Sequence, residues 1–133
     1  MIVRPFKDGD LNFILSTWLR SYYDALTQYS KRAQARLAPS HDVFFQEHQR
    51  KIKETLKTAK VFILTTAEEN DQIIGYIVFE GDALHFCYVK APFRKLGVAK
   101  KLCKEMVGVK QYSHHTTYSK YIAKDFIYNP YKF

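Results

Sequence analysis

The chain carries a basic, glycine-containing turn, Arg94-Lys95-Leu96-Gly97-Val98-Ala99, between two segments of different hydrophobic periodicity. The preceding segment, 83–89, is short, apolar and aromatic, which predicts a strand. The following segment, 98–107, repeats apolar residues at helical spacing. The first N–H groups of a helix have no partner within the helix and attract anions, and Gly97 lets a ligand approach the backbone closely. The turn is therefore a candidate phosphate-binding site.

The composition is typical of a globular protein. The 133 residues are 47% hydrophobic and 26% charged, with five glycines and four prolines, which favours one domain over residues 1–133. No apolar run is long enough to span a membrane, and the N-terminus lacks the apolar core of a signal peptide. Cys87 and Cys103 give neither a disulfide framework nor a metal-binding pattern. We expect a cytoplasmic protein with no metal and no membrane partner.

Charge is distributed unevenly along the chain, whose net charge is +8. Residues 1–60 carry 11 Lys or Arg and 6 Asp or Glu, residues 61–89 carry none and 5, and residues 90–133 carry 10 and 2. The basic excess predicts an anionic ligand or partner near the turn and disfavours strongly cationic acceptors. The alternative interpretation is a solvated lysine-rich surface.

Hydrophobic periodicity predicts a mixture of helices and strands, with a loop over residues 27–40. The expected strands are 2–6, 61–65, 73–79, 83–89, 112–116 and 126–128. The expected helices are 11–22, 41–57, 98–107 and 118–124. The order β-α-α-β-β-β-α-β-α-β indicates a mixed α/β (α+β) fold, in which a mostly antiparallel sheet is flanked by helices.

Three local features refine this prediction. Gly75, inside an expected strand, indicates a close backbone approach or a bulge. Gly81-Asp82 predicts a tight turn, so the strands on either side form a hairpin. Strict alternation along the second strand places Leu84, Phe86 and Tyr88 on one face and His85 and Cys87 on the other.

Together these features resemble the GNAT superfamily of acyl-CoA-dependent N-acyltransferases. The signature of that family is Arg or Gln, two residues, Gly, one residue, then Gly or Ala, and the turn at 94–99 satisfies it. Pro92 and the strand before it also fit, as does the hairpin built from 73–79. Downstream, Tyr121 to Phe126 has the spacing of a family element written Tyr-x-x-x-Gly-Phe, with Asp125 in place of the glycine. In length and composition the chain is similar to small members encoded by viruses and prophages.

The resemblance implies acetyl-CoA as the acyl donor. The backbone N–H groups of the turn, from Lys95, Leu96, Gly97, Val98 and Ala99, would hold the pyrophosphate, with Arg94 adding positive charge. Exposed backbone at Tyr88 and Val89 would pair with the amides of the pantetheine arm as an added strand does. The reaction implied is direct attack of an amine on the thioester.

The resemblance also suggests two catalytic residues. Tyr121 matches the position of the family's general acid, and its ordinary pKa near ~10 keeps its proton available. His85 lies on the strand where family members often place a base, with a suitable ordinary pKa near ~6.5. Each has a purely structural alternative. The pair His114-His115 points to opposite faces of an expected strand, so at most one side chain reaches the site.

Several functional interpretations stay open. The leading one is an N-acetyltransferase acting on an amine of a small molecule or a protein. The second is a nucleic-acid-binding or nucleobase-modifying protein, suggested by basic residues at 31–36 and 50–60. The third is a non-catalytic coenzyme-binding interaction protein, since the family usually has two further strands after the segment at 126. The acceptor side would then be open, built from residues 23–42, or completed by a second subunit in an oligomer.

Overall fold

The computed structural model describes residues 1–32, 40–66, 72–116 and 119–133. Its strands are β1 (Ile2–Pro5), β2 (Lys60–Thr65), β3 (Ile73–Glu80), β4 (Ala83–Val89), β5 (Gln111–Tyr112) and β6 (Ile127–Tyr128). Its α-helices are α1 (Leu11–Arg32), α2 (His41–Leu56), α3 (Val98–Cys103) and α4 (Ser119–Ile122). The predicted element order is confirmed, and with it the mixed α/β fold class.

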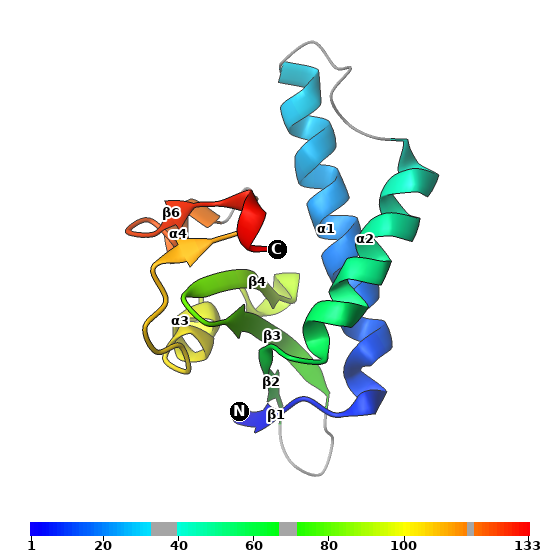
Figure 1. Ribbon diagram of the computed structural model, residues 1–133. Coiled ribbons are helices and arrows are strands. Elements are labelled where there is room, and N and C mark those ends of the chain that lie inside the picture. Colours follow the sequence, from blue (N-terminus) through cyan, green and yellow to red (C-terminus); the bar gives the residue numbers. More distant parts are fainter. Residues whose placement is uncertain (33–39, 67–71, 117–118) are drawn as a thin grey trace.

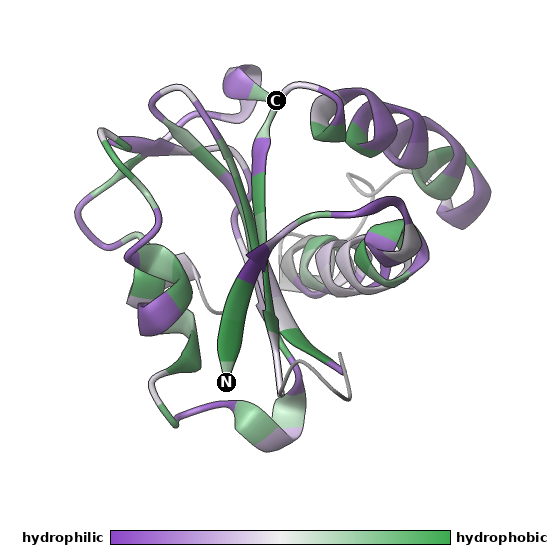
Figure 2. Ribbon diagram, turned by 90° about the horizontal axis from the view of Figure 1, so that it is seen from below, coloured by the Kyte–Doolittle hydropathy of each residue, from purple (hydrophilic) through white to green (hydrophobic). Residues whose placement is uncertain are grey.

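The six strands form one sheet in the order β1-β2-β3-β4-β5-β6. The first four pair antiparallel with their neighbours, while β4–β5 and β5–β6 are parallel. Helices α1 and α2 cover one face of this sheet and α3 lies on the other (Figures 1 and 2). The sheet therefore separates two hydrophobic clusters, one under α1 and α2 and one under α3.

The first helix is longer than predicted. Residues 27–32 were expected in a loop, but α1 continues to Arg32. Just before this extension, the ring of Tyr23 lies 5.1 Å from that of Phe44 and 5.8 Å from that of Phe45, both on α2. Contact of α1 with a distant segment thus supports the helix next to a stretch of weak local periodicity. Residues 33–39 and the predicted turn over 68–71 lie outside the described residues.

The elements after β4 are all shorter than predicted, including α4 and β6. Helix α3 ends at Cys103, and the chain continues to Met106 in a turn closed by i→i−3 bonds, including Met106 N–H to Cys103 O at 3.1 Å. Strand β5 contains two residues, so Ser113 to Thr116 are not in a strand. The backbone leaves the sheet there because its polar side chains bond elsewhere, as described below.

The segment from β1 to α1 is fixed by a buried ion pair. Both terminal nitrogens of Arg4 lie 2.8 Å from the carboxylate oxygens of Asp10, which also accepts the Lys7 backbone N–H at 2.9 Å. Burial acts to raise the pKa of Asp10, but these hydrogen bonds and the Arg4 charge outweigh it and hold the pKa below its ordinary value. Asp10, directly before α1, thus connects the start of that helix to β1.

The predicted glycine contact in β3 is confirmed. A Cβ built on Gly75 would clash with the carbonyl oxygen of Tyr88 and would lie 3.3 Å from Cα of Val89. Gly75 therefore allows β3 and β4 to approach closely near the end of β4. Within the described ranges, the helices lack the combination of length and apolarity that crossing a membrane requires.

Candidate functional site

The end of strand β4 has an open edge. Strand β5 pairs with β4 only at Ala83 and Leu84, and one further bond joins Ser113 N–H to Leu84 O at 3.0 Å. Beyond this point the two segments separate, while β3 continues to pair with β4 as far as Val89. Within the described chain, no strand covers this part of the β4 edge.

The hydrogen-bond alternation of β4 decides which backbone groups face that edge. Lys90 N–H donates to Ile74 O at 2.8 Å. Because the backbone groups of successive residues point to opposite edges of a strand, every second residue counted back from Lys90 also bonds to β3. The amides of Cys87 and Val89 therefore point to the open edge, whereas that of Tyr88 points into the ladder. Of the two backbone positions expected for pantetheine, Val89 faces the open edge, and Cys87, which was not predicted from the sequence, faces it as well.

The turn after β4 has the conformation expected for Gly97. Gly97 is left-handed, with φ of +78°, and caps the start of α3, while Lys95 is the only non-glycine residue with positive φ in the described chain, at +66°. Lys95, Leu96 and Gly97 are exposed. In the described residues no protein acceptor bonds to the backbone N–H groups of residues 95–99. These donors are available to an anion.

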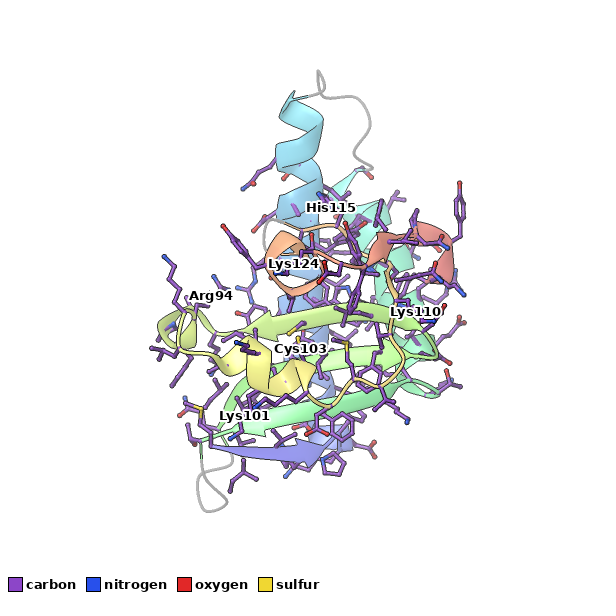
Figure 3. All side chains as sticks on the ribbon, turned by 90° about the vertical axis from the view of Figure 1, so that its left-hand side faces the viewer. Arg94, Lys101, Cys103, Lys110, His115 and Lys124 are labelled. Carbon is purple, nitrogen blue, oxygen red and sulfur yellow. The ribbon has the colours of Figure 1, made fainter. Side chains whose placement is uncertain are left out.

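Arg94 lies between the strand and the turn. Its Nε donates to Val89 O at 2.8 Å, and its guanidinium carbon lies 5.7 Å from the centre of the Tyr88 ring. Arg94 thus fixes the turn to the end of β4 in addition to contributing positive charge there. Figure 3 shows Arg94 at one end of the sheet, on the face that also carries α3 and α4.

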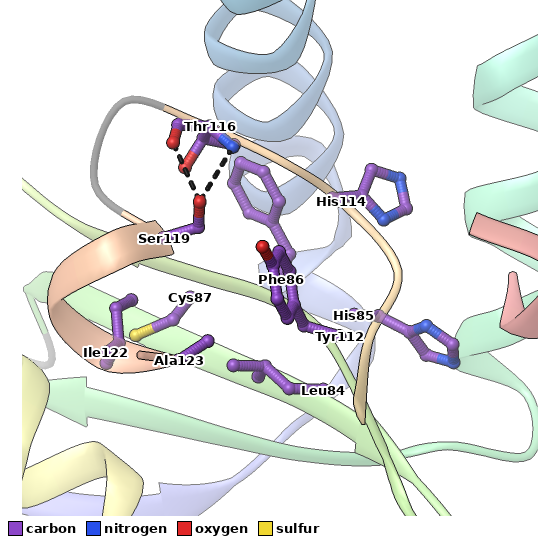
Figure 4. Close-up of a pocket in the computed structure, with 10 residues that line it drawn as sticks. All are labelled: Leu84, His85, Phe86, Cys87, Tyr112, His114, Thr116, Ser119, Ile122 and Ala123. Atoms are coloured by element: carbon purple, nitrogen blue, oxygen red, sulfur yellow. Dashed lines mark hydrogen bonds between the residues drawn. The ribbon is translucent and has the colours of Figure 1, made fainter. Parts of the chain in front are cut away.

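A pocket opens where β4 and β5 separate (Figure 4). Its volume is about 300 Å³ with its open mouth included. Helix α4 forms one wall and is fixed by Ser119, whose hydroxyl donates to Thr116 O at 2.8 Å and accepts from Thr116 N–H at 3.2 Å. Its lining consists of Leu84, His85, Phe86, Cys87, Tyr112, His114, Thr116, Ser119, Ile122 and Ala123.

The predicted alternation of β4 is wrong at one point. Val78 pairs with Phe86 and Phe79 pairs with Leu84, so His85 is an extra residue in a β-bulge. Leu84 and Cys87 pack in the cluster under α3, whereas Phe86 and Tyr88 pack in the cluster under α1 and α2. The ring of His85 points away from Cys87 and Ile122 (Figure 4).

His85 belongs to a chain of buried hydrogen bonds. Its Nδ1 lies 2.7 Å from the Ser113 hydroxyl, which lies 2.8 Å from Nδ1 of His114. His114 Nε2 lies 3.0 Å from Nε2 of His48, on α2. His85, Ser113 and His114 are buried and His48 is half-buried. Of the pair His114-His115, of which at most one was predicted to reach the site, His114 joins this arrangement and His115 is exposed, although neither lies in a strand.

The surroundings keep all three histidines neutral at neutral pH. Burial, reinforced by the charge of Lys51, lowers the pKa of His48 to about 4. Burial lowers the pKa of His85, with Glu80 acting in the opposite direction. Burial also places the pKa of His114 well below its ordinary value, and His48, His85 and Lys51 add to this effect.

Tyr121 does not line the pocket. It lies on α4 with 71% of its surface exposed, and its neighbours Ile122 and Ala123 occupy the wall instead. Its role as general acid stays a prediction. In the described residues there is no group of three or more His, Cys, Asp or Glu side chains arranged to hold a metal ion.

The basic surface proposed for nucleic acid is divided. Arg50 pairs with Glu47 at 3.3 Å and with Glu54 at 3.4 Å, and Lys51 bonds to Phe133 O at 3.3 Å. Lys60 lies in β2 and not on the helix. The side chains of residues 31–36 lie outside those described.

Comparison with known proteins agrees with the geometry. The family model described as the acetyltransferase (GNAT) family matches residues 15–123. The apo form of YjaB from Escherichia coli superposes with a TM-score of 0.52 at 19% identity, over 78% of this chain and 63% of that one. A GCN5-related N-acetyltransferase from Rhodopseudomonas palustris gives 0.53 at 16% identity, over 77% and 61%. At these identities the likeness concerns the fold, and the chain spans about three fifths of the length of both structures. No curated protein matches the sequence.

Proposed function

Because the chain belongs to the GNAT family of acetyltransferases, we propose that it transfers an acetyl group from acetyl-CoA to an amine. The observation that carries this proposal is the open edge of β4, which leads directly into a turn with unpaired N–H groups. A linear donor with a phosphate at one end and amides along its length matches both features.

The residues of the turn fit the coenzyme chemically. The N–H groups of Lys95, Leu96, Gly97, Val98 and Ala99 would hold the pyrophosphate, and Gly97 leaves open space in front of the backbone. Arg94 keeps the turn attached to β4, and Val89 and Cys87 offer backbone groups for the pantetheine amides. The bound donor supplies an activated thioester carbonyl. The acceptor is an amine of a small molecule or a protein.

His85 is the proposed base for the acceptor amine. It is neutral at neutral pH, since burial lowers its pKa, and it is one of the residues that line the pocket, with its ring hydrogen-bonded to Ser113 and turned away from Cys87 and Ile122 (Figure 4). A neutral imidazole can accept the proton that the attacking amine must lose. Tyr121, exposed on α4, is the proposed acid for the leaving thiolate and requires the bound donor to reach over that helix.

Gly97→Asp tests the coenzyme site. The carboxylate should repel the pyrophosphate, while the fold persists because Asp tolerates positive φ and the Cβ meets no atom within 4 Å. The measurement is thermal unfolding with and without acetyl-CoA. At 100 times its dissociation constant the donor should add about 2.7 kcal/mol to the stability of the wild type, a shift of several degrees.

Gly108→Asp is the matched control. Gly108 also has positive φ, +72°, and open space at its Cβ, but it lies beyond α3 and outside the turn. This variant should keep the full acetyl-CoA shift. An unshifted wild type, or a shift that persists in Gly97→Asp, contradicts the proposed coenzyme site.

A further inference from the structure

Three histidines from three distant segments are joined through one serine. His48 comes from α2, Ser113 and His114 follow β5, and His85 is the bulged residue of β4. The distances are 3.0 Å from His48 to His114, 2.8 Å from His114 to Ser113 and 2.7 Å from Ser113 to His85. All are within ordinary hydrogen-bond distance, so the four side chains form one continuous path.

Both ends of this path reach solvent. The fully enclosed side-chain polar atoms without a hydrogen-bond partner, in the described part of the chain, are Trp18 Nε1 and Thr66 Oγ1. His48 Nδ1 and His85 Nε2 also make no hydrogen bond to the protein, but they are not enclosed. One end of the path is His85, which is among the residues that line the pocket. The other end is His48 on α2, which is half-buried.

The protons in the chain can be arranged in only two ways. Each neutral imidazole has one N–H, and the serine hydroxyl has one O–H. If His85 Nδ1–H donates to Ser113, the hydroxyl donates to His114 Nδ1, and His114 Nε2–H then donates to His48 Nε2. If His48 Nε2–H donates to His114, every bond reverses and His85 Nε2 carries a proton. The two arrangements interconvert when one proton passes through the chain.

Resting on the proposed function, we propose that His85, Ser113, His114 and His48 form a proton relay between the reacting amine and the surface. His85 is the catalytic end, which touches the substrate. Ser113, His114 and His48 are positioning residues that act through His85.

Proton balance is complete over one turnover. In the first arrangement, His85 Nε2 takes the proton that the amine loses as its nitrogen bonds to the carbonyl carbon. Protons shift along Ser113 and His114, and His48 Nδ1 releases one to water. The chain is then in the second arrangement. When the carbon–sulfur bond breaks, Tyr121 protonates the leaving thiolate and regains a proton from water. His85 Nε2–H then releases its proton to water, His48 Nδ1 takes one from water, and the first arrangement returns.

The surroundings of the three histidines favour passing a proton along the hydrogen bonds over holding a charged imidazolium. The rings of Trp18, Tyr22 and Phe133 pack around His114, with centroids 5.2, 4.5 and 4.4 Å from it. The other titratable groups facing the chain are Lys51 beside His48, Glu80 near His85, and Tyr22 with its partner Tyr128. None of these groups is a carboxylate in contact with His114 or His48. An extra proton on either ring would therefore create a positive charge without a counter-ion, which favours its transfer to the next group.

The first experiment needs no substrate. Nitrogen-15 NMR of the imidazole rings reports the tautomer of each histidine in the complete chain. We expect His85, His114 and His48 to match one of the two arrangements together. Ser113→Ala should uncouple the tautomers of His85 and His114, and Ser113→Thr, which keeps the hydroxyl, should restore them. Tautomers that fit neither arrangement, or that are unchanged in Ser113→Ala, overturn the relay whether or not acetyl-CoA binds.

The second experiment measures release of the coenzyme thiol from acetyl-CoA with a panel of primary amines. His48→Ala, near the surface, should lower kcat about tenfold or more with little change in KM for acetyl-CoA, and added imidazole should restore kcat. His41→Gln is the matched control, since His41 is an exposed histidine on the same helix that takes no part in the hydrogen-bonded path. A wild-type kcat in His48→Ala overturns the relay, whereas a wild type that does not bind acetyl-CoA contradicts the proposed function instead.

Discussion

Gly75 shows how a single hydrogen atom in place of a side chain shapes the site. It lies opposite Val89, and its missing Cβ leaves room for the carbonyl oxygen of Tyr88. The close approach of β3 and β4 at this point supports the end of β4, where the open edge begins. Gly75 thus determines the position of Tyr88 and Val89, at the open edge of β4.

Gly75→Ala should therefore destabilise the protein. Its Cβ would meet backbone, which cannot rotate away as a side chain can, so we expect a loss of about 2–3 kcal/mol in the free energy of unfolding. Gly9→Ala is the control, because a Cβ there meets no atom within 4 Å, and its effect should stay within about 0.5 kcal/mol. Urea unfolding measures both; equal stabilities for the two variants would contradict the contact.

At the scale of elements, α1 is joined to the sheet by a buried polar contact as well as by apolar packing. The hydroxyl groups of Thr17 and Tyr76 lie 2.8 Å apart, and Tyr76 is fully buried. Thr17 donates its hydroxyl hydrogen to Phe13 O at 2.7 Å, so Tyr76 is the donor between the two hydroxyl groups. Burial raises the pKa of Tyr76 well above its ordinary value, so the phenol stays protonated.

A double-mutant cycle measures this connection between α1 and β3. Thr17→Val and Tyr76→Phe should each lower the free energy of unfolding by about 1 kcal/mol, because each leaves a buried hydroxyl with fewer partners. The double variant should lose less than the sum, giving a coupling energy of about 0.5–1.5 kcal/mol. Ser16→Ala, next to Thr17 but exposed, is the control and should be additive with Tyr76→Phe. Additivity in the Thr17 cycle would rule out the contact.

The β-bulge in β4 has the largest consequence of any element for the candidate site. The extra residue at His85 places Leu84 and Phe86 on opposite faces, whereas unbroken pairing would place them on the same face. His85 can then bond to Ser113 while Cys87 faces α4. Without the bulge, His85 and Cys87 would lie on the same face of the sheet.

For the whole molecule, the buried histidines connect stability to pH. Folding holds the pKa of His48 at about 4 and lowers those of His85 and His114, so below pH 6.5 the unfolded chain binds more protons than the folded one. Stability is therefore complete above about pH 6.5 and is lost as the pH falls toward 4. Each histidine adds a slope of up to about 1.4 kcal/mol per pH unit.

This slope is measurable by urea unfolding between pH 7 and pH 4.5, above the range in which Asp10 takes up protons. His48→Gln should make it shallower, because one of the three groups is removed, while His41→Gln should leave it unchanged. A stability that does not vary across this range, or a slope that His48→Gln does not alter, would contradict the burial of uncharged histidines.

The sequence by itself determined the element order and the glycine-containing turn at 94–99, because these depend on local features. Apolar spacing within a few residues predicts each long helix and strand, and a glycine after a strand predicts the left-handed start of α3. The close approach at Gly75 and the hairpin after β3 were likewise readable from single residues. Features of this kind can be predicted from the sequence because the residues that cause them are close together along the chain.

Only the tertiary structure decided the inner part of the site. The bulge at His85 depends on the register between β3 and β4, and α1 continues past Tyr23, which packs against Phe44 of α2. The chain from His85 to His48 joins residues 28, 1 and 66 positions apart in its successive bonds. Hydrogen bonds between distant segments leave no periodic trace in a sequence, since each partner is a single polar residue whose neighbour is set by the fold.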